Sequence, residues 1–398
     1  MRFENKKKIG LVLSGGGIKA AAFHIGVCLA LKEKGFKFAG GPKDPSGKPK
    51  DKDPMTIQLY VGSSAGAFIS SILAAGYSAE ALINAFQLGS GEVPRFNSMD
   101  YTALKPLSYR HIFAVNGGSF LKFLPQSFLR KSVVTGGLEA FIKNGFKVNG
   151  LFSTRGLERY LRKYVFVEND FSRLNAELYI VATQLNHTRK AIFSNFKESS
   201  KTPTTKYINY ASISQAVACS AALPPIFSPY GLERPDKKVL YFYDGEIRET
   251  LSAHVAADHG CDLVLSSYSM QPYHFTEEMG SLHEYGIPVI LNQALYQVLE
   301  QKHTKHVEWQ HNMKQIYKTI DNYFKQHGLP EEHREKILEV YRTRFNYRPE
   351  VDYVHITPRP QNYEMFFVDH FSLSPKILER IVRVGFKSAI SALRRHNM

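Results

Sequence analysis

The stretch Gly62-Ser63-Ser64-Ala65-Gly66 constrains the fold of this chain more than any other segment. An apolar run, 57–61, precedes it and a second apolar run, 67–73, follows it. This order predicts a strand, a tight turn and a helix with a serine at the turn, which is the pattern of a nucleophile elbow. Gly62 and Gly66 remove side chains where the strand and the helix nearly collide. Ser64 would stand at a helix N-terminus, where N–H groups and the helix dipole favour a developing anion.

A glycine-rich turn lies upstream of the elbow. The apolar run 8–13 leads into Gly15, Gly16 and Gly17, and a helical pattern covers 21–31. Three successive glycines let backbone N–H groups point toward one place, which suits an oxyanion or a phosphate. The spacing Gly15-x-Gly17-x-x-Ala20 also resembles a dinucleotide-binding turn, but no acidic residue ends a second strand about 20 residues later. We therefore favour an oxyanion hole over a nucleotide site or a purely structural turn.

A third feature is the aromatic and β-branched run 239–243, which ends in Asp244-Gly245-Glu246. We expect Asp244 at the C-terminal edge of a parallel sheet, where the active sites of open α/β sheets lie. Taken by itself, the pattern fits an ordinary Asp-Gly turn better than a catalytic site.

Together the three features resemble the patatin-like phospholipase family. The family's serine motif is matched fully by Gly62–Gly66. Its glycine-rich motif is matched by Gly15–Ala20, with Ala20 in place of a final glycine, and its Asp-Gly motif by Asp244-Gly245-Glu246, with Glu246 in place of glycine or alanine. Further similar segments are 152–161, 178–183, 218–227, 353–358 and 378–392.

The resemblance implies a Ser-Asp dyad without histidine, with Ser64 as nucleophile and Asp244 as general base. The N–H groups of Gly15, Gly16 and Gly17 would hold the oxyanion, and no metal or cofactor is required. The supporting motif residues are Gly62, Gly66, Lys19 and Gly245. A carboxylate with a pKa of about 4 is a poor base for an alcohol, so Asp244 must be partly desolvated and hydrogen-bonded to the hydroxyl.

The two departures from the family pattern differ in weight. Ala20 falls inside the helix start, where a Cβ is tolerated if φ is negative. Glu246 adds a second carboxylate beside the base, and facing the site it would raise the pKa of Asp244. We expect Glu246 to point away, because residues two apart need not converge in a turn.

Histidines offer an alternative catalytic arrangement. An α/β-hydrolase triad would draw on His254 or His259, but both fall in an apparent helix directly after the Asp-Gly turn. We read His24 as a helix residue near the site. His303, His306 and His311 lie in a polar helix pattern without thiols or clustered carboxylates, so we expect a solvated face and no metal site.

Composition and charge indicate a globular protein with an anionic partner. The 398 residues carry a net charge of +15, which favours an anionic phospholipid surface, whereas no nucleic-acid-binding motif is found. Evenly spread charge that serves solubility is the alternative. Cys28, Cys219 and Cys261 lie in apolar stretches, which predicts buried free thiols in a reducing compartment.

Targeting signals are not recognised in the sequence. The first eight residues have no apolar core of a signal peptide, and no run of about 18 apolar residues could span a membrane. We expect a cytoplasmic protein that can associate peripherally with membranes, with export by a signal-less route left open. The sequence predicts no oligomeric state.

The predicted architecture is one α/β domain over 7–398, a mainly parallel sheet with helices on both faces. Two insertions are expected, a lid or helical cap at 89–150 and a helical insertion at 283–347 with a helix opened by Pro330. The segment 40–53 reads as an exposed loop. The basic amphipathic helix 374–395 could lie on a membrane, but we favour docking against the sheet.

The resemblance, together with these patterns, implies a serine acyl hydrolase that acts on phospholipids or lysophospholipids. The alternatives are an acyltransferase or general esterase with the same dyad, and an inactive membrane-binding or signalling module in which Glu246 marks a decayed site.

Overall fold

A large, mostly parallel sheet forms the centre of the protein. The computed structural model describes residues 3–43, 53–88, 103–115 and 150–398. Its central strands run in the order β13-β12-β1-β3-β6, and each pairs with its neighbours in parallel. Their bounds are β13 (Asp352–Ile356), β12 (Leu263–Ser267), β1 (Ile9–Leu13), β3 (Thr56–Ser63) and β6 (Glu177–Gln184). The predicted α/β class with a mainly parallel sheet is confirmed.

Beyond β6 the sheet becomes mixed. Strand β7 (Lys190–Phe193) is antiparallel to β6, β9 (Thr205–Ile208) is parallel to β7, and β8 (Ser200–Lys201) is antiparallel to β9. Strand β11 (Val239–Asp244) also pairs antiparallel with β6 and carries β10 (Tyr230–Glu233) on its other edge. Asp244 therefore ends an antiparallel strand, and it pairs with β6 just beyond the C-terminal end of the parallel strand β3. The short β2 (Lys37–Phe38) pairs with β3, and β4 (Ala114–Val115) pairs with β5 (Phe152–Ser153) in a separate ribbon.

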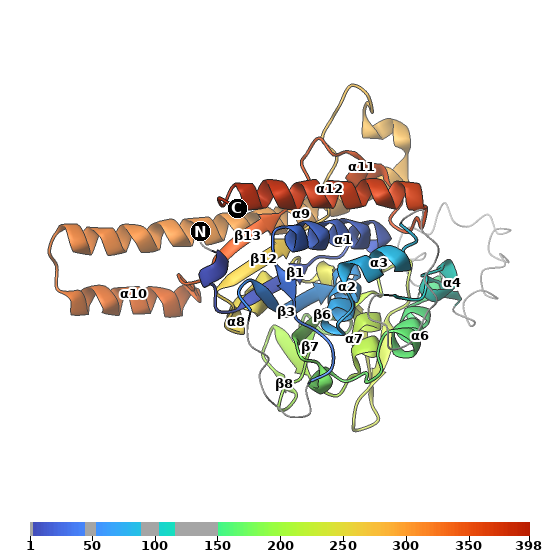
Figure 1. The fold of residues 1–398 in the computed structure, drawn as a ribbon, viewed down its shortest axis with the longest axis horizontal. Helices are drawn as coiled ribbons and strands as arrows, with labels where there is room; N and C mark the ends of the chain where they lie inside the picture. The colour runs from blue at the N-terminus through green and yellow to red at the C-terminus, as the bar shows by residue number, and fades with distance from the viewer. Residues whose placement is uncertain (1–2, 44–52, 89–102, 116–149) are drawn as a thin grey trace, which may run out of the picture.

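Helices cover both faces of the sheet, because alternate strand residues point to opposite sides. Leu11 and Leu13 pack into one core cluster and Val12 into another. The first core is covered by α1 (Gly17–Glu33), α2 (Ala65–Ala74), α3 (Ala79–Ala85), α6 (Arg155–Tyr164), α7 (Ile213–Ser220) and α12 (Pro375–Arg394). The second is covered by α8 (Ala253–Asp258) and the beginning of α9 (Ile287–Gln326). The short helices α4 (Tyr109–Ile112) and α11 (Glu364–Phe367) flank this body (Figure 1).

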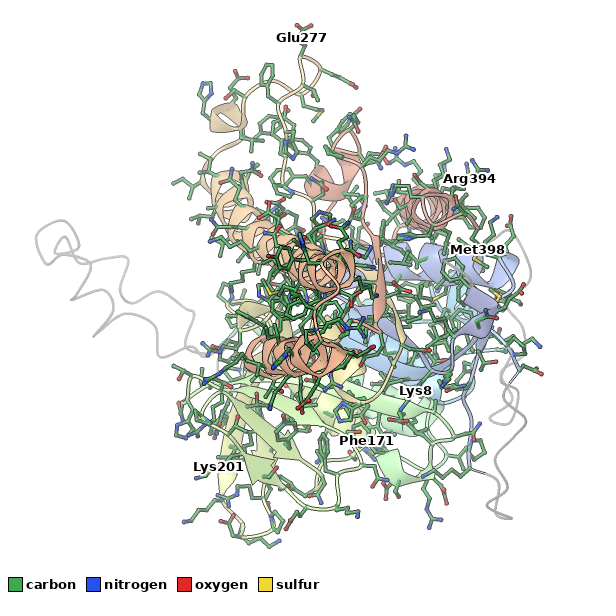
Figure 2. The ribbon with its side chains drawn as sticks, turned by 90° about the vertical axis from the view of Figure 1, so that its left-hand side faces the viewer. Lys8, Phe171, Lys201, Glu277, Arg394 and Met398 are labelled. Atoms are coloured by element: carbon green, nitrogen blue, oxygen red, sulfur yellow. The ribbon has the colours of Figure 1, made fainter. Side chains whose placement is uncertain are left out.

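The last helix, α12, packs against α1. A Cβ added at Gly26 would lie 2.0 Å from the Val382 carbonyl oxygen, and one at Gly385 would lie 2.1 Å from the Phe23 carbonyl oxygen. Paired glycines therefore let the two helix backbones touch. The sequence predicted docking on the sheet, whereas α12 docks mainly on α1, which lies between them. In Figure 2, α12 is seen end-on near Arg394, beside the core.

The expected helical insertion at 283–347 forms a long hairpin. Helix α9 and helix α10 (Glu331–Phe345) extend away from the sheet (Figure 1). Leu338 and Tyr341 of α10 are buried, as the pattern after Pro330 indicates.

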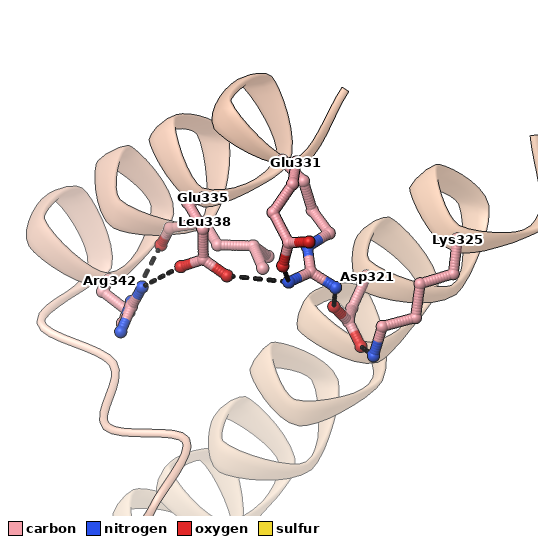
Figure 3. Close-up of polar contacts among 7 residues, drawn as sticks. Asp321, Lys325, Glu331, Glu335, Leu338 and Arg342 are labelled. Carbon is pink, nitrogen blue, oxygen red and sulfur yellow. Dashed lines mark hydrogen bonds and ion pairs between the residues drawn. The ribbon is translucent and has the colours of Figure 1, made fainter. Parts of the chain in front are cut away.

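Charged side chains hold the outer part of this hairpin together. Arg334 reaches Asp321 on α9 at 3.4 Å and Glu335 at 3.0 Å, and it also pairs with Glu331 (Figure 3).

Most of the predicted insertion at 89–150, expected to form a lid or helical cap, lies outside the described residues. So does most of the predicted exposed loop at 40–53. Cys28, Cys219 and Cys261 are buried and free, as predicted. Within the described ranges, none of the helices combines the length and hydrophobicity needed to cross a bilayer.

Candidate active site

The turn at Ser64 has the geometry of a strained elbow. Strand β3 ends at Ser63 and helix α2 begins at Ala65, as the sequence predicts. Ser64 adopts φ 51° and ψ −119°, a region that residues other than glycine rarely occupy. A Cβ at Gly66 would lie 2.0 Å from the Leu13 carbonyl oxygen, and one at Gly62 would lie 2.4 Å from the Gly66 carbonyl oxygen. Only glycine fits at both positions.

Asp244 reaches the elbow along the neighbouring strand. On β6, Val181 pairs with Ser63 of β3 and Ala182 pairs with Asp244 of β11. Strand β11 therefore pairs with β6 directly beyond the last residue of β6 that pairs with β3. A Cβ at Gly245 would lie 2.3 Å from the Val181 carbonyl oxygen, so this glycine permits the close approach.

The Asp244 carboxyl is buried, with 2% of the residue exposed. Burial raises its pKa to about 6, and the nearby Ser64 hydroxyl and the Glu246 N–H, which favour the carboxylate, oppose part of this shift. The Ser64 hydroxyl lies close enough to hydrogen-bond with the Asp244 carboxyl, and this contact favours the carboxylate. Catalytic hydrogen bonds of unliganded enzymes are often long and tighten when substrate binds. A pKa near 6 suits a general base at neutral pH.

The glycine-rich turn joins β1 to α1 beside Ser64. The Gly15 N–H donates to Oε1 of Glu246 at 2.8 Å. Gly16 and Gly17 have φ values of 126° and 74°, and within the described residues their N–H groups make no hydrogen bond. Of the three predicted oxyanion donors, Gly15 is therefore engaged, whereas Gly16 and Gly17 have unused N–H groups.

Glu246 points into the site region, so the expectation that it faces away is wrong. A short 3₁₀ helix, Gly245–Ile247, curls the chain so that the Glu246 N–H donates to Oδ1 of Asp244 at 2.9 Å. The carboxyl of Glu246 accepts hydrogen bonds from the Gly15 N–H and the Ser63 hydroxyl. Burial raises the pKa of Glu246 to about 8, and the charge of Asp244 adds to this rise.

Two hydroxyls that the sequence analysis did not single out brace the site. Ser220 Oγ accepts a hydrogen bond from the Ser64 N–H at 2.8 Å and donates to the Val181 carbonyl at 2.5 Å. Thr183 Oγ1 donates to the Asp244 carbonyl at 2.9 Å. The sequence showed only that Ser220 lies in the segment 218–227, which resembles the family, and this did not indicate its role.

Lys19 ties the start of α1 to the segment 365–370. Its ammonium is 1% exposed and donates to the carbonyls of Met365 at 2.7 Å and Val368 at 3.3 Å. Burial lowers the pKa of Lys19 to about 7, against the opposing charge of Asp369. The Ile18 N–H donates to the His370 carbonyl at 2.7 Å. Lys19 therefore holds the segment 365–370 in place beside Gly17.

His24 is buried beneath the glycine-rich turn. Its Nε2 lies 2.8 Å from the Ser14 carbonyl oxygen and its Nδ1 lies 2.8 Å from Ser267 Oγ. Burial lowers the pKa of His24 to about 4, so the ring is neutral and braces the turn.

An apolar pocket opens at Ser64, with an empty volume of about 550 Å³ that includes the solvent at its mouth. Its walls come from α1, α2, α4, α6 and the segments around Phe227 and Phe371. The lining residues are Gly17, Ile18, Ala21, Ser64, Ala65, Phe68, Phe86, Leu107, Ile112, Thr154, Leu157, Ala221, Phe227 and Phe371. Such a pocket can accept a hydrocarbon chain with its ester at Ser64.

The other histidines lie apart from the elbow. His254 pairs with Glu249 at 2.8 Å, and His259 packs against Tyr179, with ring centroids 4.2 Å apart. His303 is buried and stacks on Tyr268, so the prediction of a solvated face is wrong for this residue. A search of the described residues finds no group of three His, Cys, Asp or Glu side chains that could hold a metal ion.

Comparison with known families identifies the family of this chain. A family model described as patatin-like phospholipase matches residues 11–257, more than half of the chain. The matched span contains the glycine-rich turn, Ser64 and Asp244. No match was found among curated proteins.

Proposed function

The chain belongs to the patatin-like phospholipase family, and on this premise we propose that it is a serine acyl hydrolase that cleaves fatty-acyl esters of phospholipids or lysophospholipids. One observation carries the proposal. The strained Ser64 stands between the buried carboxyl of Asp244 and an apolar pocket.

Acylation begins when Asp244, as the carboxylate, accepts the proton of the Ser64 hydroxyl. Ser64 Oγ attacks the ester carbonyl carbon and forms a tetrahedral intermediate. The intermediate collapses, the alcohol part of the lipid leaves with the proton from Asp244, and the acyl group stays on Ser64. The raised pKa of Asp244 supports this role, because a carboxyl of pKa about 6 is a stronger base than an exposed aspartate.

The negative oxygen of the intermediate would be held by the N–H groups of Gly16 and Gly17. Both groups lack a partner within the described residues, and Gly17 lines the pocket with Ser64. Losing one such donor typically slows an enzyme by about 10²–10³-fold. Glycine adopts the positive φ found at both positions without the strain that a side chain would add.

Deacylation uses the same groups with water. Asp244 accepts a proton from a water molecule, the hydroxide attacks the acyl carbon, and Ser64 leaves with that proton. The products are a fatty acid and the regenerated hydroxyl, so one water is consumed per ester cleaved. The dyad needs no metal or cofactor for these steps.

The substrate class is supported by the pocket and by the charge of the chain. Aromatic and aliphatic side chains line the pocket, which favours an acyl chain over a polar group. The net charge of +15 favours an anionic lipid surface as the place where the enzyme finds its substrate. We propose peripheral binding to such a surface from the cytoplasm.

Purified protein incubated with vesicles of fluorescent phosphatidylglycerol tests the function. We expect release of free fatty acid, and its loss in Ser64→Ala and in Asp244→Asn. Matched controls are Ser199→Ala and Asp258→Asn, at a serine and an aspartate distant from the elbow in sequence and fold, which should keep the activity. Vesicle binding without any fatty-acid release in the wild type would contradict the proposal and favour the inactive module.

A further inference from the structure

Glu246 connects the three motif segments of the site. Oε1 of its carboxyl accepts hydrogen bonds from the Gly15 N–H, at 2.8 Å, and from the Ser63 hydroxyl. Its own N–H donates to Oδ1 of Asp244 at 2.9 Å. One residue therefore contacts the glycine-rich turn, the residue before the nucleophile and the base.

The fit between Glu246 and the glycine-rich turn is tight. A Cβ added at Gly15 would lie 2.7 Å from Cγ of Glu246 and 2.9 Å from Cβ of Ser64. The stem of Glu246 thus fills the space that a side chain at residue 15 would need. Because the glycine-rich turn packs against the Glu246 side chain, we expect that side chain to fix the position of Gly16 and Gly17 relative to Ser64.

The surroundings of Glu246 disfavour a negative charge. The residue is 4% exposed, and among the described residues no lysine or arginine neutralises it. The Gly15 N–H and the Ser63 hydroxyl donate to Oε1, and the Leu251 N–H also favours the charged form, but burial and the charge of Asp244 oppose these donors at Glu246. Asp244 lies beside it, and two adjacent buried carboxyls do not ionise together readily.

We propose that Glu246 is a positioning residue that acts as a neutral carboxylic acid and clamps the glycine-rich turn against the elbow strand. This inference rests on the proposed function of the site. When Glu246 loses its proton, a negative charge appears beside the N–H groups that would bind the oxyanion, and catalysis slows. Burial raises the pKa of Glu246 to about 8 and that of Asp244 to about 6. Between these two pH values Asp244 is charged and Glu246 is neutral, which is the active combination.

The groups with shifted pKa values on the neighbouring elements, Tyr268, His24 and His303, stay neutral in this interval. Burial raises the pKa of Tyr268, which follows β12, further above its ordinary value, and the charge of Glu246 adds to the rise. His24 of α1 and His303 of α9 are buried, and the pKa of each is lowered to about 4, so both rings are neutral. On α9, the charge of Glu300 contributes to the raised pKa of Tyr268, and the exposed Lys302 donates a hydrogen bond to the Ile247 carbonyl at 3.0 Å.

The pH dependence of Glu246→Gln tests the proposal. Glutamine keeps a carbonyl oxygen for Gly15 and Ser63 but cannot ionise. With a soluble p-nitrophenyl ester, kcat/KM of the wild type should rise as Asp244 ionises and fall as Glu246 ionises. Glu246→Gln should keep kcat/KM at pH 7 within about threefold of the wild type and lose the alkaline fall, because only the charge has been removed. Glu246→Ala, which removes the clamp, should lower kcat at least about tenfold with a smaller effect on KM.

Two results would overturn the proposal. A folded Glu246→Gln protein that is inactive at pH 7 would show that the charge is required. An alkaline fall that persists unchanged in Glu246→Gln would show that another group causes it. Thermal melting of each variant establishes that it is folded.

An infrared measurement separates this proposal from the proposed function. At pH 7 the wild type should show a band of a protonated carboxylic acid that Glu246→Gln lacks and Asp244→Asn keeps. Absence of this band in the wild type refutes the neutral clamp even if the enzyme is active. If Ser64→Ala is as active as the wild type, the hydrolase mechanism fails while the infrared result stands on its own.

Discussion

Ser63 and Asp244 pair with consecutive residues of β6, Val181 and Ala182, so two strands far apart in the sequence meet end to end at one strand edge. Strand β3 arrives parallel to β6 and turns away at Ser64, and β11 arrives antiparallel and stops at Asp244. The proposed nucleophile and base are thus brought together by strand pairing. Ser220 of α7 accepts a hydrogen bond from the Ser64 N–H, and His24 of α1 lies beneath the glycine-rich turn, within hydrogen-bond distance of the Ser14 carbonyl.

The dyad predicts a steep and non-additive loss of activity. Ser64→Ala and Asp244→Asn should each lower kcat by about 10³-fold or more, and the double variant should be little worse than either, because the two residues act as one unit. Steady-state kinetics on a p-nitrophenyl ester measures this. Losses that multiply in the double variant would contradict the shared role.

The close contact at the elbow predicts that Gly66→Ala destabilises the fold. Its Cβ would lie 2.0 Å from the Leu13 carbonyl oxygen, so β1 and α2 must separate. We expect the free energy of unfolding to fall by about 2 kcal/mol or more, as for other overpacked core sites. Gly328→Ala in the hairpin is the control, since its Cβ meets nothing within 4 Å and only its φ of +59° adds strain. Urea unfolding that gives equal losses for both would refute the argument.

Features that depend on contacts between neighbours in the sequence could be predicted, whereas features that depend on contacts between distant segments could not. The elbow could be predicted because Gly62, Ser64 and Gly66 are neighbours, and their close contacts follow from one strand–turn–helix unit. The antiparallel direction of β11 could not, since it is decided by which strand lies beside it. The docking of α12 depends on Gly26 and Gly385, two glycines that carry no signal of their partner.

Glu246 was misjudged for a similar reason. Its direction is set by the 3₁₀ helix after Asp244 and by two donors, Gly15 and Ser63, from strands that are distant in sequence. His303 was read as solvated because the sequence does not reveal that Tyr268 stacks on its ring.

The pocket predicts a change in chain-length preference when it is narrowed. Ala21 of α1 lines the pocket, and Ala21→Leu adds three carbon atoms there. We expect kcat/KM for a p-nitrophenyl palmitate to fall about tenfold relative to the butyrate, because displaced methylene groups are each worth about 0.8 kcal/mol. The ratio of the two values measures this. An equal loss for both esters would indicate that the acyl chain lies elsewhere.

Lys19 predicts a pH-dependent contribution to stability. Burial lowers its pKa from 10.5 to about 7, so between these values the unfolded chain binds more protons than the native one. The free energy of unfolding should therefore rise with pH from about 7 toward 10 on account of this group. In Lys19→Met this part of the rise should be missing, whatever the absolute stability of the variant. Chemical unfolding at several pH values measures both slopes, and identical slopes would contradict a buried lysine with a lowered pKa.

Trapping the acyl-enzyme tests the central claim most directly. A long-chain alkyl fluorophosphonate should add one phosphonyl group to the protein, and peptide mass spectrometry should locate it on Ser64. Labelling should be much slower in Asp244→Asn and absent in Ser64→Ala. A phosphonyl group on any other residue, or equal labelling of the wild type and Asp244→Asn, would contradict a mechanism in which Asp244 activates Ser64.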